Sequence, residues 1–235
     1  NDTLTIFGSA TMTTDGNLQG IEIINWTESG SDSIVDLSNQ TEGFIFNITD
    51  DVSGSDLLIL GNGNDTINGV SELDSGADTL DGGVGINTAN VAFGYNFGAD
   101  SLLLQVQNIV MTGFGTVDLA QQTEAFTVTG SAGNDTVVLG SGAYNLDGDM
   151  GDDTVTGAAT VTVADTLHGG AGVDTLSLTD DTGTTDLDNV SGFEFINIVN
   201  TNASAYTTLD TLVAAGAMLT VTQTGNQNLT FNGTS

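Results

Sequence analysis

The chain contains neither Lys nor Arg, and this absence excludes whole classes of function. Its 235 residues include 31 Asp and Glu, so the formal net charge is -31 at pH 7. Nucleic acid is excluded as a partner because proteins bind phosphate backbones through Lys and Arg, and anionic membrane surfaces are disfavoured for the same reason. No Lys or Arg can neutralise the carboxylates, so we expect cations from solution to stabilise the folded state.

Cys, Pro and long apolar runs are also missing. Without Cys, a disulfide scaffold and thiolate metal sites are excluded. The 32 Gly residues come without Pro and without a three-residue period, which excludes collagen. No apolar run is long enough to cross a bilayer, so direct membrane insertion is not expected. The hydrophobic content of 38% and the chain length do suffice for a folded core.

What the chain has instead is a nonapeptide repeat with Gly at its fourth position, Asp at its sixth and an aliphatic residue at its eighth. Residues 169–177 read GGAGVDTLS, a complete match to G-G-x-G-x-D-x-U-x. Several adjacent nonamers follow the same pattern in register, which is a specific signal. They are residues 51–59 (DVSGSDLLI), 60–68 (LGNGNDTIN), 73–81 (LDSGADTLD), 82–90 (GGVGINTAN), 130–138 (GSAGNDTVV), 139–147 (LGSGAYNLD), 148–156 (GDMGDDTVT) and 160–168 (TVTVADTLH).

Some nonamers depart from the pattern. Asn87 and Tyr144 stand where Asp is expected, and residues 160–168 lack the glycines. We therefore expect a handful of sites rather than one uninterrupted row.

A longer and weaker repeat overlays the nonamers. It reads GIEIIN at residues 20–25, VQN at 106–108 and GFEFIN at 192–197. The chain begins with NDTLTIFG, without an initiator Met or a signal-peptide pattern, and we expect it to be an excerpt or a processed product. We divide it into a strand-rich part at 1–50, a first nonamer cluster at 51–107, strands with a second cluster at 108–181, and a strand-rich part at 182–235. One continuous solenoid is the alternative division.

The repeat predicts an all-β fold, a right-handed parallel β-roll or β-solenoid in which each coil buries its aliphatic residue against its neighbours. Two nonamers should make one coil, so positions eighteen residues apart should stack. Glycines permit positive φ and let carbonyl oxygens turn inward, and the sixth residue adds a carboxylate. Hard oxygen ligands in a flexible loop favour Ca²⁺ over Mg²⁺, which demands tight octahedral geometry. The sequence therefore predicts calcium between coils.

These nonamers resemble the RTX (repeats-in-toxin) β-roll of proteins that Gram-negative bacteria export by type I secretion. The resemblance covers a third to a half of the chain and implies an extracellular or cell-surface protein that folds on calcium. Asp135 and Asp153 lie eighteen residues apart, which makes them the best candidates for one shared site. Carried over by position, the implied metal ligands are Asp56, Asp65, Asp78, Asp135, Asp153, Asp165 and Asp174, with the carbonyls of Gly63, Gly133, Gly151 and Gly172.

The GIEIIN and GFEFIN units between nonamers, with the richness in Thr, Ala, Asn and Gly, are more loosely similar to RTX-containing bacterial S-layer proteins. We therefore expect a calcium-dependent structural module of an S-layer, matrix or filament. Its expected partner is a second copy of itself, with cell-surface polysaccharide as a further candidate. The main alternative is a segment of a large RTX adhesin that binds a surface, a glycan or ice. A calcium module of a secreted hydrolase is the weaker alternative.

Catalysis is not expected, because the chain has no G-x-S-x-G elbow, no H-E-x-x-H and no phosphate loop with Lys. The single His168 has no Cys or clear carboxylate partner in the sequence and is interpreted as a surface residue. Each nonamer Asp has an alternative interpretation as an Asx turn without metal. The third and fifth nonamer positions vary, so the sequence predicts no regular Thr or Asn ladder of the kind that an ice-binding face requires.

Overall fold

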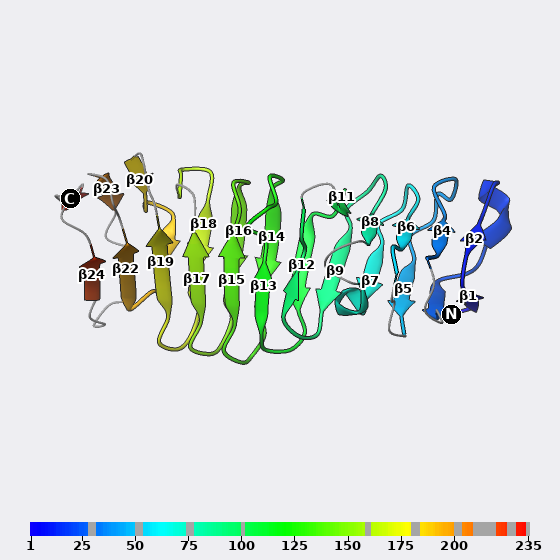
Figure 1. Ribbon diagram of the computed structural model, residues 1–235, viewed down its shortest axis with the longest axis horizontal. Coiled ribbons are helices and arrows are strands. Elements are labelled where there is room, and N and C mark those ends of the chain that lie inside the picture. Colours follow the sequence, from blue (N-terminus) through cyan, green and yellow to red (C-terminus); the bar gives the residue numbers. More distant parts are fainter. Residues whose placement is uncertain are drawn as a thin grey trace. The chain divides into compact units, whose positions relative to one another are not determined.

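The structure is a computed structural model that describes residues 1–27, 32–49, 54–73, 78–99, 102–157, 161–179, 184–199, 204–208, 220–224 and 229–233. It divides into two compact units, Asn1–Thr112 and Gly113–Ser235. Within each unit the chain winds through short strands, and each strand lies beside the strand of the next coil (Figure 1). None of the helices in the described part is long and apolar enough to span a membrane.

The first unit has two parallel sheets. The first sheet holds, in spatial order, β1 (Thr3–Phe7), β3 (Ile23–Thr27), β5 (Ile45–Ile48), β7 (Thr66–Asn68), β9 (Thr88–Val91) and β12 (Asn108–Met111). The second sheet holds β2 (Ala10–Thr11), β4 (Ile34–Asp36), β6 (Leu57–Ile59), β8 (Thr79–Asp81) and β11 (Leu103–Leu104). The unit also contains the strand β10 (Tyr95–Asn96) and two 3-10 turns, η1 (Asp15–Leu18) and η2 (Val70–Glu72).

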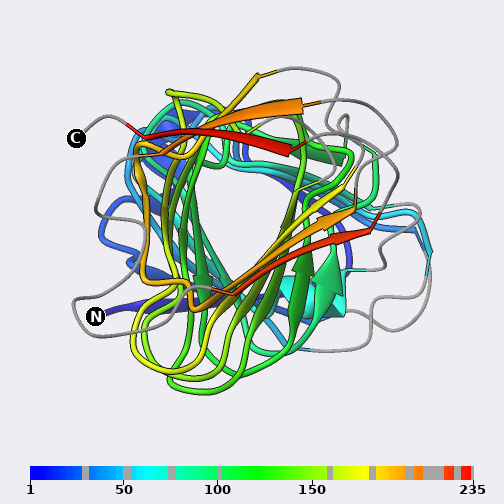
Figure 2. The same cartoon turned by 90° about the vertical axis from the view of Figure 1, so that its left-hand side faces the viewer.

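The second unit is also built from parallel strands, and its strands form three sheets. One sheet holds β13 (Thr116–Asp118), β15 (Thr136–Leu139), β17 (Thr154–Gly157), β19 (Thr175–Thr179), β22 (Phe195–Val199) and β24 (Thr220–Thr224). Another holds β14 (Phe126–Thr129), β16 (Tyr144–Asp147), β18 (Thr166–His168) and β21 (Val190–Ser191), and the third holds β20 (Thr184–Asp186), β23 (Ser204–Thr208) and β25 (Leu229–Gly233). Figure 2 shows the coils of this unit end-on, with the sheets on different sides of a common interior. The predicted all-β parallel solenoid is confirmed.

The coil length differs from the predicted eighteen residues at most positions. The eighteen-residue step occurs where β15 pairs with β17, Thr136 opposite Thr154, and where β14 pairs with β16. Elsewhere the step is longer: β7 Thr66 lies opposite β9 Thr88, 22 residues on. The cause is visible in the sequence, because residues 69–72, which contain η2, separate two nonamers there, whereas residues 130–156 are three nonamers without interruption.

The interior is built from the eighth residue of each nonamer, as predicted. Each of these aliphatic side chains is buried because strand residues alternate between the interior and the outer face. They are Leu58, Ile67, Leu80, Ala89, Val137, Leu146, Val155, Leu167 and Leu176. Successive coils place them in register, so that Phe46, Ile67 and Ala89 stack in one row without exposed surface.

An Asn ladder lies on the outer face of the first sheet, where the sequence predicted no such ladder. The side-chain amide of Asn47 donates to Asn25 Oδ1 at 2.8 Å, Asn68 donates to Asn47 at 2.7 Å and Asn90 donates to Asn68 at 2.6 Å. Asn68 and Asn90 occupy the ninth nonamer position, whereas the prediction considered the third and fifth positions. The ladder went unseen because its members lie at the ninth position or outside the nonamers, 21 or 22 residues apart and not the predicted eighteen.

Candidate metal centre between the coils

The seven predicted Asp ligands are all buried. Their exposed fractions range from 0% to 5%, and they are the buried acidic residues of the described part of the chain. Burial of a carboxylate without a cation is costly, so a chain places it inside only if it has partners there. The strand that follows each Asp fixes its position, because the aliphatic residue two places later is anchored in the interior.

Each buried Asp makes the same hydrogen bond between coils. Its Oδ1 accepts the backbone N–H of the residue at the same position of the preceding coil. In the second unit Gly115 N–H donates to Asp135 at 3.1 Å, Asp135 N–H to Asp153 at 2.7 Å and Asp153 N–H to Asp174 at 2.8 Å. The structure thus brings Asp135 and Asp153 together as predicted, and adds Asp174 to the same row.

The other predicted Asp residues form shorter rows. Ser33 N–H donates to Asp56 and Asp56 N–H donates to Asp78, both at 2.7 Å. Phe44 N–H donates to Asp65 at 2.7 Å. Tyr144 N–H donates to Asp165 at 2.9 Å.

The second carboxylate oxygen separates five of the seven Asp residues into two kinds. Oδ2 of Asp65, Asp153 and Asp174 is buried and has no hydrogen-bond partner. Oδ2 of Asp135 accepts the backbone N–H of Ser131 at 2.6 Å, and Oδ2 of Asp165 accepts that of Thr162 at 2.8 Å. Asp65, Asp153 and Asp174 therefore keep a buried oxygen that is available to a cation. In Asp135 and Asp165 the second oxygen already accepts a hydrogen bond from the backbone.

Burial also shifts the titration of Asp65, Asp153 and Asp174. Burial raises the pKa of Asp65 to about 6, against the lowering effect of the hydrogen bond from Phe44. Burial likewise raises the pKa of Asp153 to about 6, and the neighbouring carboxylates of Asp174 and Asp135 raise it further. The pKa of Asp174 is also raised, first by burial. As anions, these groups need positive charge, and the chain has no Lys or Arg to supply it.

Glycine at the first nonamer position brings backbone carbonyls close to these carboxylates. A Cβ at Gly148 would lie 2.5 Å from Asp153 Oδ2 and would overlap the carbonyl oxygen of Gly169 in the next coil. A Cβ at Gly169 would lie 2.8 Å from the Asp174 Cβ. In these two coils glycine leaves room for carboxylate and carbonyl groups side by side, whereas the nonamer of Asp65 has Leu60 at this position.

The predicted carbonyl ligands at the fourth position lie along the contact between coils. A Cβ at Gly85 would overlap the carbonyl oxygen of Gly63, and a Cβ at Gly172 would overlap that of Gly151. A Cβ added at Gly151 would lie 2.6 Å from the carbonyl oxygen of Gly133. Glycine is required here for conformation as well, since φ is +127° at Gly151 and +155° at Gly172.

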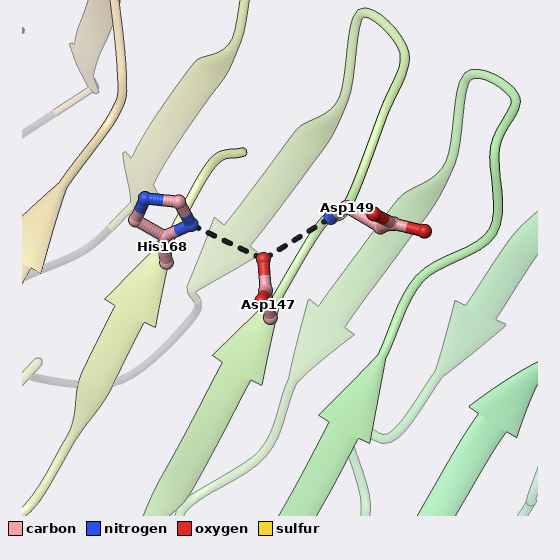
Figure 3. A network of polar contacts seen from close by, with 3 residues as sticks. All are labelled: Asp147, Asp149 and His168. Carbon is pink, nitrogen blue, oxygen red and sulfur yellow. Dashed lines mark hydrogen bonds and ion pairs between the residues drawn. The ribbon is translucent and has the colours of Figure 1, made fainter. Parts of the chain in front are cut away.

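The Asx turn, the alternative interpretation of the nonamer Asp, belongs to different residues. The Asp that ends a strand accepts the N–H two residues later, as Asp81 does from Gly83 at 2.9 Å and Asp147 from Asp149 at 3.2 Å. Asp147 Oδ1 also lies 3.1 Å from His168 Nδ1 on the next coil (Figure 3). Because the His168 and Asp147 side chains are 49% and 62% exposed, this pair is a surface contact.

Sequence reasoning missed the residues that end the Asp rows. Asn87 N–H donates to Gln107 Oε1 at 2.8 Å, and Asp174 N–H donates to Glu194 Oε2 at 2.9 Å. Glu22 Oε2 accepts Asp2 N–H in the same way. These three residues are the acid or amide of VQN, GFEFIN and GIEIIN, so the longer repeat supplies a side chain that takes the place of the nonamer Asp. The signal was a Glu or Gln at a fixed place in that repeat.

The donor set fits Ca²⁺ at Asp65, Asp153 and Asp174. Each offers a buried carboxylate oxygen without a donor, and at Asp153 and Asp174 a backbone carbonyl of the next coil lies close as well. Hard oxygen ligands of these two kinds are what Ca²⁺ takes in flexible loops. No three acidic or His side chains gather in the described part of the chain, so carbonyl oxygens would have to complete the coordination. All the predicted ligands, the seven Asp residues and the carbonyls of Gly63, Gly133, Gly151 and Gly172, stay predictions.

The comparisons with known proteins point to the same repeats. A family model for the RTX calcium-binding nonapeptide repeat (4 copies) matches residues 52–89, 129–159 and 164–184. These segments contain all seven buried Asp residues. A search of the curated proteins finds no match.

Proposed function

Because the chain carries RTX calcium-binding repeats, we propose that it is a calcium-dependent structural module of a bacterial extracellular assembly, such as an S-layer, a matrix or a filament. One observation carries the proposal: a chain without Lys or Arg buries seven carboxylates, and three of them keep an oxygen that no donor contacts. A bound Ca²⁺ supplies positive charge and a shell of several oxygen ligands. The chain's own part is to hold carboxylate and carbonyl oxygens in register between coils.

Calcium then acts as the trigger for folding. Ions that bind the folded chain and not the unfolded chain add their binding free energy to stability. Extracellular calcium modules bind with dissociation constants of about 10⁻⁴ to 10⁻³ M. Inside a cell, where free Ca²⁺ is scarce, the carboxylates repel one another and the chain stays expanded and exportable. Outside, calcium neutralises the rows and the coils close, which suits a secreted protein of the type I export route.

Assembly with further copies is supported by the kind of surface that the fold presents. The outer face of the first sheet carries neutral side chains, among them the ladder of Asn25, Asn47, Asn68 and Asn90 and the exposed Phe7 and Ile45. Such a face carries little charge in a chain of net charge -31, so it offers copies a place to meet without carboxylate repulsion. We propose a structural role without catalysis, because the buried carboxylates bind groups of the neighbouring coil at the contacts between coils, which are called joints below.

A calcium titration tests the proposal. Far-UV circular dichroism and sedimentation velocity are followed as Ca²⁺ is raised from zero to about ten times the range given above, with Mg²⁺ as the control. We expect β-structure to appear with Ca²⁺ alone and large assemblies to follow. A chain that folds with Ca²⁺ and stays monomeric favours the adhesin segment or the hydrolase calcium module. A chain that is equally folded in chelator contradicts the calcium mechanism.

A further inference from the structure

Asn87 occupies the sixth position of its nonamer, where every other nonamer except that of Tyr144 carries Asp. It has no exposed surface. Its side-chain Oδ1 accepts Asp65 N–H at 2.9 Å, the same bond that each buried Asp makes with the preceding coil. Asn87 therefore preserves the hydrogen bond between coils while carrying no charge.

The other half of the Asn87 amide points into a cluster of backbone carbonyls. Its Nδ2 donates to Gly82 O at 2.8 Å in its own coil and to Gln105 O at 2.8 Å in the next coil. Gly83 O lies 3.5 Å away. A positively polarised group thus stands among three carbonyl oxygens from two coils, which is the environment that a cation between coils would have.

Asp65 occupies the corresponding place one coil earlier. Leu60 N–H donates to Asp81 O as Gly82 N–H donates to Leu104 O, so Leu60 and Gly82 hold matching positions in successive coils. Asp65 Oδ2 corresponds to Asn87 Nδ2, and it is buried without a partner. At matching positions of two successive coils, Asp65 therefore presents an anionic oxygen and Asn87 presents two N–H donors.

We propose that the Asn87 amide replaces the bridging cation at its own joint, so that the coil of residues 82–90 closes on the coil of Gln105 without calcium. The inference rests on calcium binding by the Asp-bearing coils, and it is independent of self-assembly. Asn87 N–H in turn donates to the neutral Gln107, so the side chains at this position are uncharged in both coils of the joint. The first unit therefore contains a joint that stays closed when the Asp-bearing joints have lost their ions.

Two reciprocal substitutions test this inference. N87D keeps the acceptor for Asp65 N–H and replaces both donors with a carboxylate oxygen, so Gly82 O and Gln105 O lose their partner unless an ion binds. D65N makes the opposite change one coil earlier. N64D is the matched control, because it adds the same charge at an exposed position of the adjacent loop and keeps the acceptor for Ile86 N–H.

Bound calcium is counted by equilibrium dialysis at saturation, and the Ca²⁺ midpoint of folding is measured by circular dichroism. We expect N87D to bind one ion more than the wild type and to need several-fold more Ca²⁺ to fold. D65N should bind one ion fewer and fold at lower Ca²⁺, and N64D should match the wild type in ion count.

The inference is overturned if N87D binds no additional ion and folds at the wild-type midpoint, or if it behaves as N64D does. If N87D fails to fold at any Ca²⁺ concentration, D65N decides: an unchanged ion count in D65N also overturns the inference. A wild-type chain that binds no calcium would be a different failure. It would overturn the calcium-dependent module itself, whatever the variants do.

Discussion

One row of hydrogen bonds between coils in each nonamer cluster uses the same bond but carries a different charge. In the second cluster, Asp135, Asp153 and Asp174 follow one another and Glu194 ends the row. In the first cluster, Asp65 is followed by the neutral Asn87 and Gln107. The second row therefore concentrates negative charge. Burial raises the pKa of both Asp153 and Asp65, and neighbouring carboxylates raise that of Asp153 further. The repeat sets the backbone hydrogen bonds between coils. The residue at the sixth nonamer position decides how strongly the contact between two coils depends on bound ions.

Removal of calcium should have the largest effect and should separate the two rows. In chelator we expect the N–H groups of Asp135 and Asp153 to lose most of their protection from hydrogen exchange, because three neighbouring carboxylates then repel one another. The Asn87 N–H should keep more protection, since its row is held by neutral donors and acceptors. Hydrogen exchange with mass spectrometry at matched peptides measures both. If hydrogen-exchange protection falls equally in the two rows, the rows do not differ in their dependence on calcium.

Substitution of Gly148 should have the next largest effect. In G148A the new Cβ meets Asp153 Oδ2 and the Gly169 carbonyl, so the second row must open, at a cost of roughly 1–3 kcal/mol in the free energy of unfolding. Urea unfolding in saturating Ca²⁺ measures the cost. G16A in η1 is the control, because a Cβ there meets no atom within 4 Å and should leave stability nearly unchanged.

Acidification should stabilise the calcium-free chain and weaken calcium binding. The pKa of Asp65 and Asp153 is about 6 in the folded chain against 3.8 as the ordinary value, so the folded chain binds more protons between these pH values. Without calcium, stability should therefore rise as the pH falls through 6 toward 4. With calcium, protons compete for the same carboxylates and the folding midpoint should move to higher Ca²⁺. Circular dichroism at pH 7 and pH 5, in chelator and in Ca²⁺, tests both signs.

The smallest effect is expected at the surface pair of the second unit. H168Q removes the contact of His168 with Asp147, which lies in solvent on the outer face (Figure 3). Exposed pairs of this kind contribute little to stability, so the melting temperature and the number of bound ions should stay at the wild-type values. A clear loss of bound calcium in H168Q would connect this pair with the interior row.

The sequence predicted the local features of the fold and missed those that depend on the spacing between coils. Glycine, Asp and aliphatic positions within a nonamer predict which side chains turn inward, and Asp65, Asp153 and Asp174 are buried accordingly. Which residues meet between coils depends on insertions such as residues 69–72, and these change the spacing from coil to coil. The Asn ladder, Gln107 and Glu194 were missed for this reason. Their partners lie 20 to 22 residues away, at distances that no single period describes.

The hydrogen bonds between coils also give the winding a direction. The sixth side chain of a nonamer accepts the N–H of the coil before it, as Asp153 does from Asp135. The fifth side chain accepts the N–H of the coil after it, as Asn134 does from Asp152 at 3.0 Å. The leading and trailing faces of a coil are therefore chemically different, and they match only when coils follow head to tail. A reversed coil would set carboxylate against carboxylate, so any continuation of such a stack can grow in one sense alone.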